Sequence, residues 1–287
     1  MRQPIRRLYP GGRSKAFNIT FDDSVMQDAR FVALLNRYGI KGTFNLNSRL
    51  MDEGFTWVHP SGMVIRRLPA EAVKELYQGH EVACHTATHP NLEGLSEEQL
   101  LWELSTDKAR LEAIFGHTIE GFAIPFHYYS PLVEHCVKQC GFTYARISEE
   151  SGSFSPYGDR YRWRSGIFHL NPGFRDFVED FLWSDEELAF CQIVGHSYDL
   201  DTENLWETIE DLLAKVSAAT DVLPMTNLEF IRYREAMNLA QFTDRHIHNL
   251  SSETLWFGVE GQIIAIPPGA CKQIRYQQGL RPAGNLL

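Results

Sequence analysis

The stretch AFNITFDDS, residues 16–24, decides how this chain is expected to fold. Ala16 to Phe21 is short and largely apolar, which predicts a strand. Asp22 and Asp23 follow directly, so both carboxylates stand at the carboxyl end of that strand. Neighbouring side chains at a strand end point in different directions, so one acid can bind a metal while the other acts as a base. These residues alone leave open the alternative that both are turn and N-cap residues.

Outward from this stretch, strand-like and helix-like patterns take turns along most of the chain. Met26 to Tyr38 has apolar residues on one helical face, and Gly42 to Leu46 reads as a second strand. Further strands are expected near residues 81–84, 122–125, 143–147, 166–170, 189–194 and 221–226, and helices at 69–78, 96–116, 131–139, 174–182, 203–218 and 228–237. Such alternation predicts parallel strands covered by helices, in an α/β fold. We expect an irregular (β/α)7-type barrel, with an open wound sheet as the alternative.

The pattern changes after residue 241. Residues 255–259 and 262–266 flank Glu260-Gly261, which predicts a β-hairpin, and Pro267-Pro268-Gly269 ends it. We therefore divide the chain into a barrel, residues 1–241, and a C-terminal β extension, residues 242–287. The extension is read either as an oligomer contact or as a sugar-binding lip, and its residues do not decide between them.

Composition excludes some classes of partner. A formal net charge of -10 argues against nucleic acid or an anionic membrane, since both need a concentrated basic face. No apolar run has the form of a signal peptide or a membrane span. The five cysteines form no zinc-ribbon pairs and lie mostly in apolar segments, which predicts reduced core thiols and a cytoplasmic location. The oligomeric state is not indicated.

Two more predicted strands end in histidines. HTATH, residues 85–89, follows the strand at 81–84, and one helical turn would bring His85 and His89 onto one face, with metal-ligand spacing. The threonine hydroxyls could then orient the rings. His196 follows the strand at 189–194, where a lone histidine is more often structural. Because carboxyl ends of parallel strands share one rim, these ends together predict a single site.

These motifs resemble those of the polysaccharide deacetylase superfamily, also called NodB-homology enzymes or carbohydrate esterase family four. TFDDS, residues 20–24, resembles its first motif, TFDD followed by a small residue. HTATH resembles its second motif, H-[ST]-x-x-H. The resemblance runs over residues 16–237 in order and spacing, and it implies an irregular barrel with a divalent metal, usually Zn²⁺.

The resemblance also implies a role for each matched residue. Asp22 matches the general base, and His196 matches the histidine that protonates the leaving amine. The implied metal ligands are Asp23, His85 and His89. Phe126 lies in AIPF, residues 123–126, where the family has R-x-P-Y, and its main-chain N–H would face the oxyanion. The family arginine, which orients the base, is replaced by Ala123.

Other residues are candidates on chemistry alone. Arg146 ends the strand at 143–147 and could orient Asp22 in place of the missing arginine, the alternative being a surface arginine beside two glutamates. Trp163 could stack on a sugar ring, and so could the neighbouring aromatic residues Phe154, Tyr157 and Tyr161, although aromatic loops as often cover a core.

The function expected is metal-dependent removal of N-acetyl groups from an amino sugar or oligosaccharide, with release of acetate. A soluble intracellular sugar is the expected substrate, because no leader is visible. Two alternatives stay open: hydrolysis of O-acetyl esters or small amides and ureides on the same site, and a catalytically silent carbohydrate-binding barrel.

Overall fold

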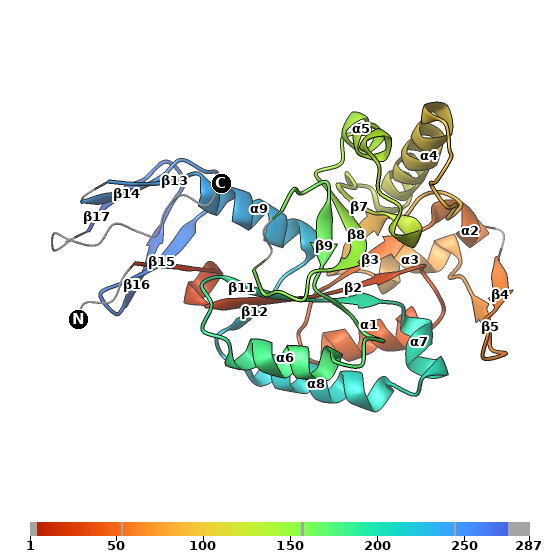
Figure 1. Ribbon diagram of the computed structural model, residues 1–287, viewed down its shortest axis with the longest axis horizontal. Coiled ribbons are helices and arrows are strands. Elements are labelled where there is room, and N and C mark those ends of the chain that lie inside the picture. Colours follow the sequence, from red (N-terminus) through yellow and green to blue (C-terminus); the bar gives the residue numbers. More distant parts are fainter. Residues whose placement is uncertain (1–4, 53, 156–157, 244, 275–287) are drawn as a thin grey trace.

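The computed structural model describes residues 5–52, 54–155, 158–243 and 245–274. A parallel sheet of nine strands forms its centre (Figure 1). The strand order is β10-β11-β2-β3-β6-β7-β8-β9, and β12 also pairs with β2. The strands are β2 (Lys15–Asp22), β3 (Gly42–Leu46), β6 (Glu81–Cys84), β7 (Gly121–Ala123), β8 (Tyr144–Glu150), β9 (Trp163–Ser165), β10 (Ile167–Phe168), β11 (Ala189–Gly195) and β12 (Val222–Pro224).

The two edges of this sheet are joined through the chain. β9 pairs with β8 at one edge and β10 pairs with β11 at the other, and only Gly166 separates β9 from β10. A Cβ atom at Gly166 would lie 2.3 Å from the Gln192 carbonyl oxygen, so a side chain does not fit at this kink. The sheet is a curled half-barrel. β9 and β10 stand at its two edges and are not paired with each other, so the described strands do not close into a complete barrel. The predicted α/β fold with an irregular barrel is confirmed, and it departs from a regular eight-stranded barrel.

Helices cover the outside of the curled sheet, with α1, α6 and α8 below it and α4 and α5 above it in Figure 1. α4 begins after the capping box of Ser96 and Gln99 and ends at the left-handed Gly116, as predicted. The helices are α1 (Asp28–Arg37), α2 (Ser48–Asp52), α3 (Ala70–Leu76), α4 (Glu97–Phe115), α5 (Pro131–Gln139), α6 (Phe174–Trp183), α7 (Ser197–Thr202), α8 (Trp206–Ala218) and α9 (Asn227–Asn238). The predicted helix 203–218 is in fact preceded by α7. No helix of the described part is long and apolar enough to cross a membrane.

The inner face of the sheet is polar. β2 is buried along its whole length, and its apolar residues 17, 19 and 21 join the core. The alternate residues point the other way, where Asn18 donates to the Met225 carbonyl at 2.8 Å and Thr20 accepts from Asn45 at 2.9 Å. Asn18 and Thr20 thus have partners, which removes most of the penalty of burying them. This polar layer leads along β2 to Asp22.

A β appendage packs at the end of the barrel away from the carboxyl ends of the strands (Figure 1). It consists of two three-stranded antiparallel sheets, and its first strand comes from the N-terminal part of the chain. The strands are β1 (Arg6–Leu8) with β15 (Leu255–Val259) and β16 (Gln262–Ile266), and β13 (Ala240–Phe242) with β14 (His246–Asn249) and β17 (Cys271–Gln273). The predicted hairpin is confirmed within these bounds. Because the appendage lies at the amino ends of the strands, the reading as a sugar-binding lip is not supported.

A small hairpin, β4 (Thr56–Val58) and β5 (Val64–Arg66), was not expected from the sequence. Residues 53–67 lack clear alternation, so local pattern does not predict these short strands, which pair with each other and accept one main-chain bond from Met26 at Arg66. The hairpin lies at the carboxyl end of the sheet, opposite the appendage (Figure 1). Among the cysteines, Cys271 is exposed on the appendage, so the expectation of core thiols fails for it.

Candidate active site

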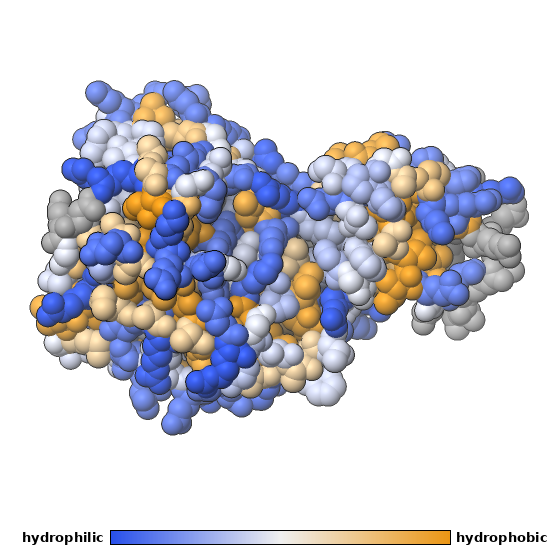
Figure 2. Space-filling view, turned by 180° about the vertical axis from the view of Figure 1, so that it is seen from behind, coloured by the Kyte–Doolittle hydropathy of each residue, from blue (hydrophilic) through white to orange (hydrophobic). Residues whose placement is uncertain are grey.

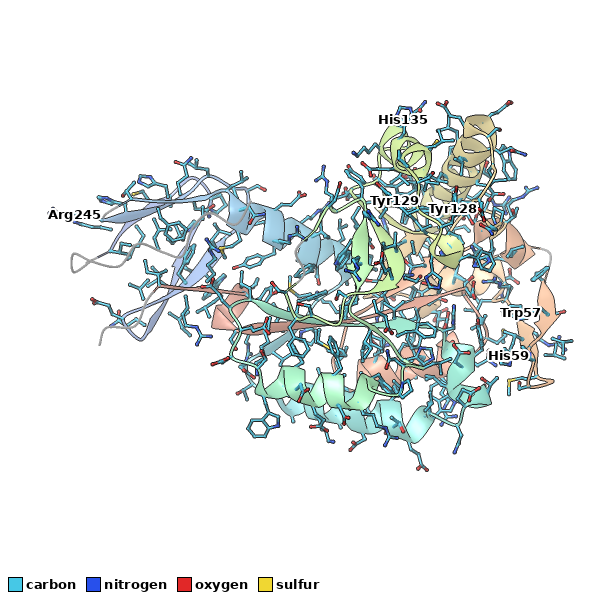
Figure 3. The ribbon with its side chains drawn as sticks, viewed as in Figure 1. Trp57, His59, Tyr128, Tyr129, His135 and Arg245 are labelled. Atoms are coloured by element: carbon cyan, nitrogen blue, oxygen red, sulfur yellow. The ribbon has the colours of Figure 1, made fainter. Side chains whose placement is uncertain are left out.

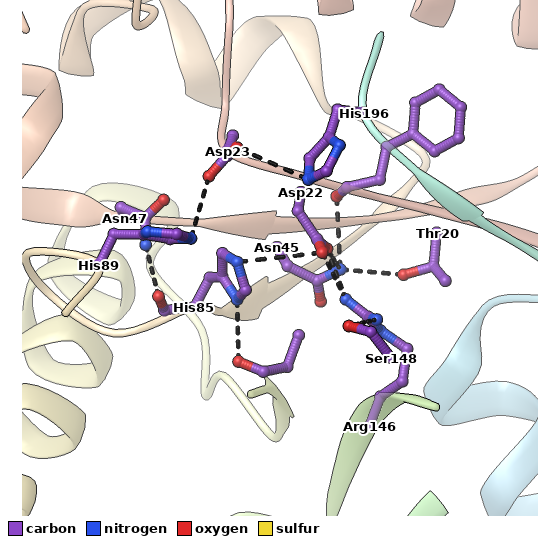
Figure 4. Close-up of polar contacts among 12 residues, drawn as sticks. Thr20, Asp22, Asp23, Asn45, Asn47, His85, His89, Arg146, Ser148 and His196 are labelled. Carbon is purple, nitrogen blue, oxygen red and sulfur yellow. Dashed lines mark hydrogen bonds and ion pairs between the residues drawn. The ribbon is translucent and has the colours of Figure 1, made fainter. Parts of the chain in front are cut away.

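The predicted residues meet at one rim of the sheet (Figure 4). Asp22 ends β2, and Asp23 follows it in a left-handed conformation, with φ of 86°. His85 follows β6, Arg146 lies in β8, and His196 follows β11. Parallel strands bring these residues together because all their carboxyl ends face the same side.

Asp23, His85 and His89 form a group that could hold a metal ion. Each offers one ligand atom, and these atoms all lie within 4.8 Å of one another. The segment from 85 to 89 is not the helical turn that we expected, because Thr86 and His89 have φ of 68° and 56°. The kinked loop still places the centroids of the His85 and His89 rings 4.9 Å apart. One carboxylate oxygen and two imidazole nitrogens are a donor set suited to zinc.

Hydrogen bonds fix the first histidine of this group. His85 Nδ1 lies 2.9 Å from the Ala123 carbonyl oxygen, which leaves Nε2 directed toward the carboxylates. The His85 main-chain N–H donates to buried Asp107 at 3.0 Å. The threonine hydroxyls bind elsewhere: Thr86 Oγ1 accepts from the His89 main-chain N–H, and Thr88 donates to Glu103. They hold the loop rather than the rings, contrary to the expectation.

Asp23 has a second partner that the sequence did not reveal. Arg67, at the end of the β4–β5 hairpin, donates to Asp23 Oδ1 at 2.9 Å and also to the Asp23 carbonyl. Arg67 further donates to Asn47 Oδ1 at 2.9 Å, and Asn47 donates to the His85 and Thr86 carbonyls. Burial raises the pKa of the Asp23 carboxyl, but the charge of Arg67 and the nearby imidazoles outweigh burial and hold the pKa well below its usual range.

Asp22 is held by Arg146, as the sequence suggested. The guanidinium Nη2 donates to both carboxylate oxygens, at 2.6 and 2.7 Å, and Asn45 donates to Oδ1 at 2.7 Å. Arg146 is fully buried, so it is not a surface residue. Burial raises the pKa of Asp22, but the charge of Arg146, together with the neighbouring imidazoles, outweighs burial and lowers the pKa. Asp22 is therefore ionised and fixed in orientation.

His196 belongs to a second pair. Its Nδ1 lies 3.0 Å from Asp199 Oδ2, and its Nε2 lies 3.7 Å from Asp23 Oδ2. Asp199 is also 3.3 Å from Nε2 of the buried His169, whose ring fills the space that a Cβ at Gly195 would need. Burial lowers the pKa of His196, but the hydrogen bond to Asp199 and the nearby carboxylates outweigh burial and raise it. The imidazole therefore holds its proton to higher pH than an ordinary histidine.

Some of the aromatic candidates border the site and others do not. Phe126 borders the site: the residue is 58% exposed, its ring centroid lies 4.7 Å from that of His89, and its φ is 52°. Trp163 does not border it, because the residue is 3% exposed and its ring stacks on Phe230 in the core. It therefore has no face free for a sugar, and that expectation is wrong. Phe154 packs on α6 and Tyr161 is bonded to the Phe142 carbonyl, while Tyr157 lies outside the described residues.

Sequence reasoning missed four residues that hold the site. Asn45 and Asn47 come at the end of β3, so the strand-end rule that found the histidines also applies to them. Asp199 lies three residues after His196, at a spacing that places both on one helical face. No pattern in the sequence marked Arg67 as a site residue, because only the folding of the β4–β5 hairpin brings it to Asp23.

Comparison with known proteins bears on this geometry. Residues 10–145 match the family model described as polysaccharide deacetylase. No curated protein sequence matches the chain. A putative polysaccharide deacetylase from Mycobacterium smegmatis has a similar structure, with a TM-score of 0.60 and 18% identity over 85% of this chain and 98% of that chain.

Two further solved structures are more distant. A CE4 family pseudoenzyme from Bacillus anthracis gives a TM-score of 0.50 and 17% identity, over 80% of this chain and 69% of that one. A Streptococcus pyogenes deacetylase, solved in complex with acetate, is 23% identical with a TM-score of 0.41, and the match covers 46% of this chain and 55% of that one. At such identities the likeness concerns the fold. The sequence match relates residues 10–145 to the polysaccharide deacetylase family, and the structural likeness shows a shared fold.

Proposed function

We propose that the protein is a metal-dependent hydrolase that removes N-acetyl groups from an amino sugar or oligosaccharide. The observation that carries this proposal is that two groups suited to proton transfer border three metal-type ligands. Asp22, held by Arg146, and His196, 3.7 Å from Asp23, both lie beside the group formed by Asp23, His85 and His89 (Figure 4). A base for water and an acid for a leaving amine are both needed for amide hydrolysis.

The residues fit a divalent metal, for which we propose zinc. Asp23, His85 and His89 would hold it, since His85 Nδ1 faces a carbonyl and its Nε2 remains for the ion. A bound metal would supply Lewis acidity, which polarises the acetyl carbonyl and makes a water molecule more acidic. Arg67 donates to Asp23 Oδ1, the oxygen that lies 3.5 Å from His89 Nε2, and so holds this carboxylate in place beside the imidazole.

Two side chains then carry out the two proton transfers, one each. Asp22 takes a proton from the attacking water, and Arg146 keeps the carboxylate ionised and aimed. A carbon–oxygen bond forms, and the carbonyl oxygen carries negative charge until the carbon–nitrogen bond breaks. His196 donates its proton to the departing nitrogen, so the products are acetate and a free amine on the sugar.

The main chain at Phe126 would stabilise the charged oxygen. The left-handed conformation of Phe126 turns this loop beside His89, and no described residue accepts from its main-chain N–H. A donor of this kind contributes about 10² to 10³ in rate in other hydrolases. The exposed ring of Phe126 would border the bound acetyl group.

An amide fits this site better than an ester. An amine leaves only when protonated. Burial lowers the pKa of His196, but the hydrogen bond to Asp199 and the nearby carboxylates raise it, so the imidazole keeps its proton to higher pH than an ordinary histidine. An activated ester has less need of such an acid. We therefore propose N-acetyl rather than O-acetyl groups as the natural substrate.

The test is metal analysis of purified protein, followed by a screen of N-acetyl sugars, O-acetyl sugars and small ureides before and after chelation. We expect about one bound divalent ion per chain and acetate release from N-acetyl sugars that chelation abolishes and zinc restores. Faster release from O-acetyl sugars would instead identify an esterase, and ammonia or ring opening would identify a ureide hydrolase. Binding of sugars without turnover would identify a carbohydrate-binding barrel that has no catalytic activity.

A further inference from the structure

A second histidine lies behind the pair formed by Asp199 and His196. His169 follows β10 at the carboxyl end of that strand, and its side chain is fully buried. Its Nε2 atom lies 3.3 Å from Asp199 Oδ2, and His196 Nδ1 lies 3.0 Å from the same oxygen. One carboxylate oxygen thus stands between two imidazole rings, one inside the protein and one half-buried at the site. The proposed proton transfers use only the half-buried ring.

The position of His169 is fixed by its surroundings. The main-chain N–H of His169 donates to the Val194 carbonyl at 2.9 Å, and its Nδ1 lies 3.1 Å from the same oxygen. The ring also packs against the buried Phe21 ring, with centroids 5.4 Å apart. It fills the space beside Gly195, where the Cβ atom of any other residue would collide with it. The His169 ring is therefore built into the end of the strand that carries His196.

Both ring nitrogens of His169 face hydrogen-bond acceptors. Nδ1 faces the Val194 carbonyl oxygen, which can only accept, so this nitrogen carries a hydrogen. Nε2 faces the Asp199 carboxylate within ion-pair distance, although the two groups are not aligned as a hydrogen bond. A neutral ring would turn a lone pair toward this negative charge, whereas an imidazolium has an N–H group on both sides. The arrangement therefore fits a positively charged ring that is paired with Asp199.

Asp199 is a buried carboxylate, and buried charges need partners. Burial raises the pKa of Asp199, but its contacts with His169 and His196 outweigh burial and lower the pKa to about 2. His196 becomes neutral when it has given its proton to the leaving nitrogen. His169 is then the cation that keeps the buried carboxylate paired, so the bond from His196 Nδ1 to Asp199 does not depend on the charge of His196.

The contact with Asp199 sets His169 apart from other histidines. Among the described residues, the imidazoles that form ion pairs with Asp199 are those of His169 and His196. His59 and His135 stand on the β4–β5 hairpin and on α5, at the outside of the molecule (Figure 3). His169 is instead enclosed by protein, with no exposed surface, so neither solvent nor substrate reaches it. Any effect of His169 on the reaction must therefore pass through Asp199.

We propose that His169 is a positioning residue: as an imidazolium behind Asp199, it holds that carboxylate so that Asp199 keeps the His196 ring turned toward the leaving nitrogen. The proposal rests on the proposed function and adds to it a residue that touches neither substrate nor metal. It also accounts for the glycine that precedes His196, because the His169 ring takes the space of a side chain at position 195.

The test replaces His169 in zinc-loaded, full-length protein. His169→Phe keeps an aromatic ring but has no donor, whereas His169→Gln keeps one. For His169→Phe we expect kcat on N-acetylglucosamine to fall by about 10- to 10²-fold, with KM and the turnover of an aryl acetate unchanged, because a phenolate leaves without an acid. His169→Gln should recover part of the loss. The control is His246→Phe, on a half-buried histidine of β14 in the appendage, the smaller lobe in Figure 2, and it should change nothing.

A double variant tests whether His169 acts through Asp199. Once Asp199→Asn has removed the carboxylate, adding His169→Phe should cause no further loss of amide turnover, whereas independent residues give additive losses. Additive losses would overturn the proposal. Equal losses on the amide and on the aryl acetate in His169→Phe would also overturn it, because they would make His169 a purely structural residue.

Nitrogen-15 NMR of the imidazole rings gives a readout that needs no turnover. In the wild type, both ring nitrogens of His169 should carry protons, and the His196 Nδ1–H signal should be protected from exchange with water. His169→Phe should remove this protection, and His169→Gln should keep it. A His169 ring with a single proton overturns the proposal, and so does a His196 signal that His169→Phe leaves unchanged.

Failure of the proposed function can be told apart from failure of this proposal. If the zinc-loaded wild type releases no acetate from any probe, the proposed function fails, and the NMR signals of His169 and His196 still decide whether the two rings are linked through Asp199. The wild-type spectrum gives the protonation of His169 even if a variant does not fold.

Discussion

Ala123 and Arg146 are register partners on the adjacent parallel strands β7 and β8, and the arginine reaches Asp22 from this position. In the family pattern the arginine stands where this chain has Ala123. Here the guanidinium comes from the next strand at the same height along the sheet. The Ala123 carbonyl, meanwhile, accepts from His85 Nδ1. One register pair therefore orients both the proposed base and a proposed metal ligand.

The first prediction concerns Arg146. Burial alone would raise the pKa of Asp22, and Arg146 is the largest influence that lowers it, so Arg146→Met should raise that pKa. The acid-side fall in kcat/KM should move to higher pH by about 1 to 3 units. Arg146→Lys retains the charge but loses the two-bond geometry, so its shift should be smaller. A pH profile of kcat/KM measures this, and an unmoved acid limb in Arg146→Met would show that Asp22 is not the group that titrates.

The second prediction separates base from ligand. Asp22→Asn should keep metal content near that of the wild type while kcat falls by about 10² to 10⁴, since it removes only the proton acceptor. Asp23→Asn should lose the metal, because Asp23 belongs to the group whose ligand atoms lie within 4.8 Å of one another. Metal analysis and turnover on the same preparations check both variants. Loss of metal from Asp22→Asn would make Asp22 a ligand.

The third prediction concerns the proton donor. His196→Ala should retain the metal and should reduce turnover of an N-acetyl sugar far more than that of an aryl acetate, because a phenolate leaves without a proton and an amine does not. We expect the amide substrate to lose about 10² or more. The measurement is kcat for both substrates. Equal losses on both would exclude His196 as the acid.

The fourth prediction concerns the partner of His196. Burial lowers the pKa of His196 and its hydrogen bond to Asp199 raises it, so Asp199→Asn should lower that pKa. The alkaline fall in kcat/KM for the amide substrate should therefore move to lower pH, by about 1 unit. Asp211→Asn removes an exposed charge on α8 and serves as the control. If both variants keep the wild-type alkaline limb, Asp199 has no effect on the acid.

The fifth prediction concerns stability. Burial raises the pKa of Asp28 to about 7, although Tyr77 and Ser197 donate hydrogen bonds to it. The folded state therefore binds a proton that the unfolded chain releases above about pH 4, and this contribution to stability disappears as pH rises toward 7. Asp28→Asn should lack this dependence. The unfolding free energy of the variant relative to wild type should rise by on the order of 2 to 4 kcal/mol between pH 4.5 and 8.

Urea unfolding of both proteins at four pH values in this range measures the difference. Comparing the two proteins removes the contributions of the other carboxylates, which change equally in both. A difference that stays constant with pH would mean that Asp28 titrates normally in the folded protein.

Local pattern in the sequence determined the strands and helices of the barrel. It also determined which acids and histidines stand at the carboxyl ends of the strands. The polar groups Asp22, Asp23, His85 and His196 follow apolar runs directly, and parallel strands necessarily bring their carboxyl ends to one rim. The helix around residues 97–115 carried its own start and stop signals in Ser96, Gln99 and Gly116, so local reasoning sufficed there.

Tertiary structure alone decided the contacts that tune and border the site. Arg67 and Trp57 lie on a hairpin without periodic pattern, and only folding places them at Asp23 and Tyr198. The sequence left two alternatives for Trp163, stacking on a sugar or covering a core, and the structure buries it against Phe190 and Phe230, since burial depends on which distant surface packs against a residue. Sequence periodicity records which face of an element is apolar, whereas side-chain partners far apart in the chain are selected by packing in three dimensions.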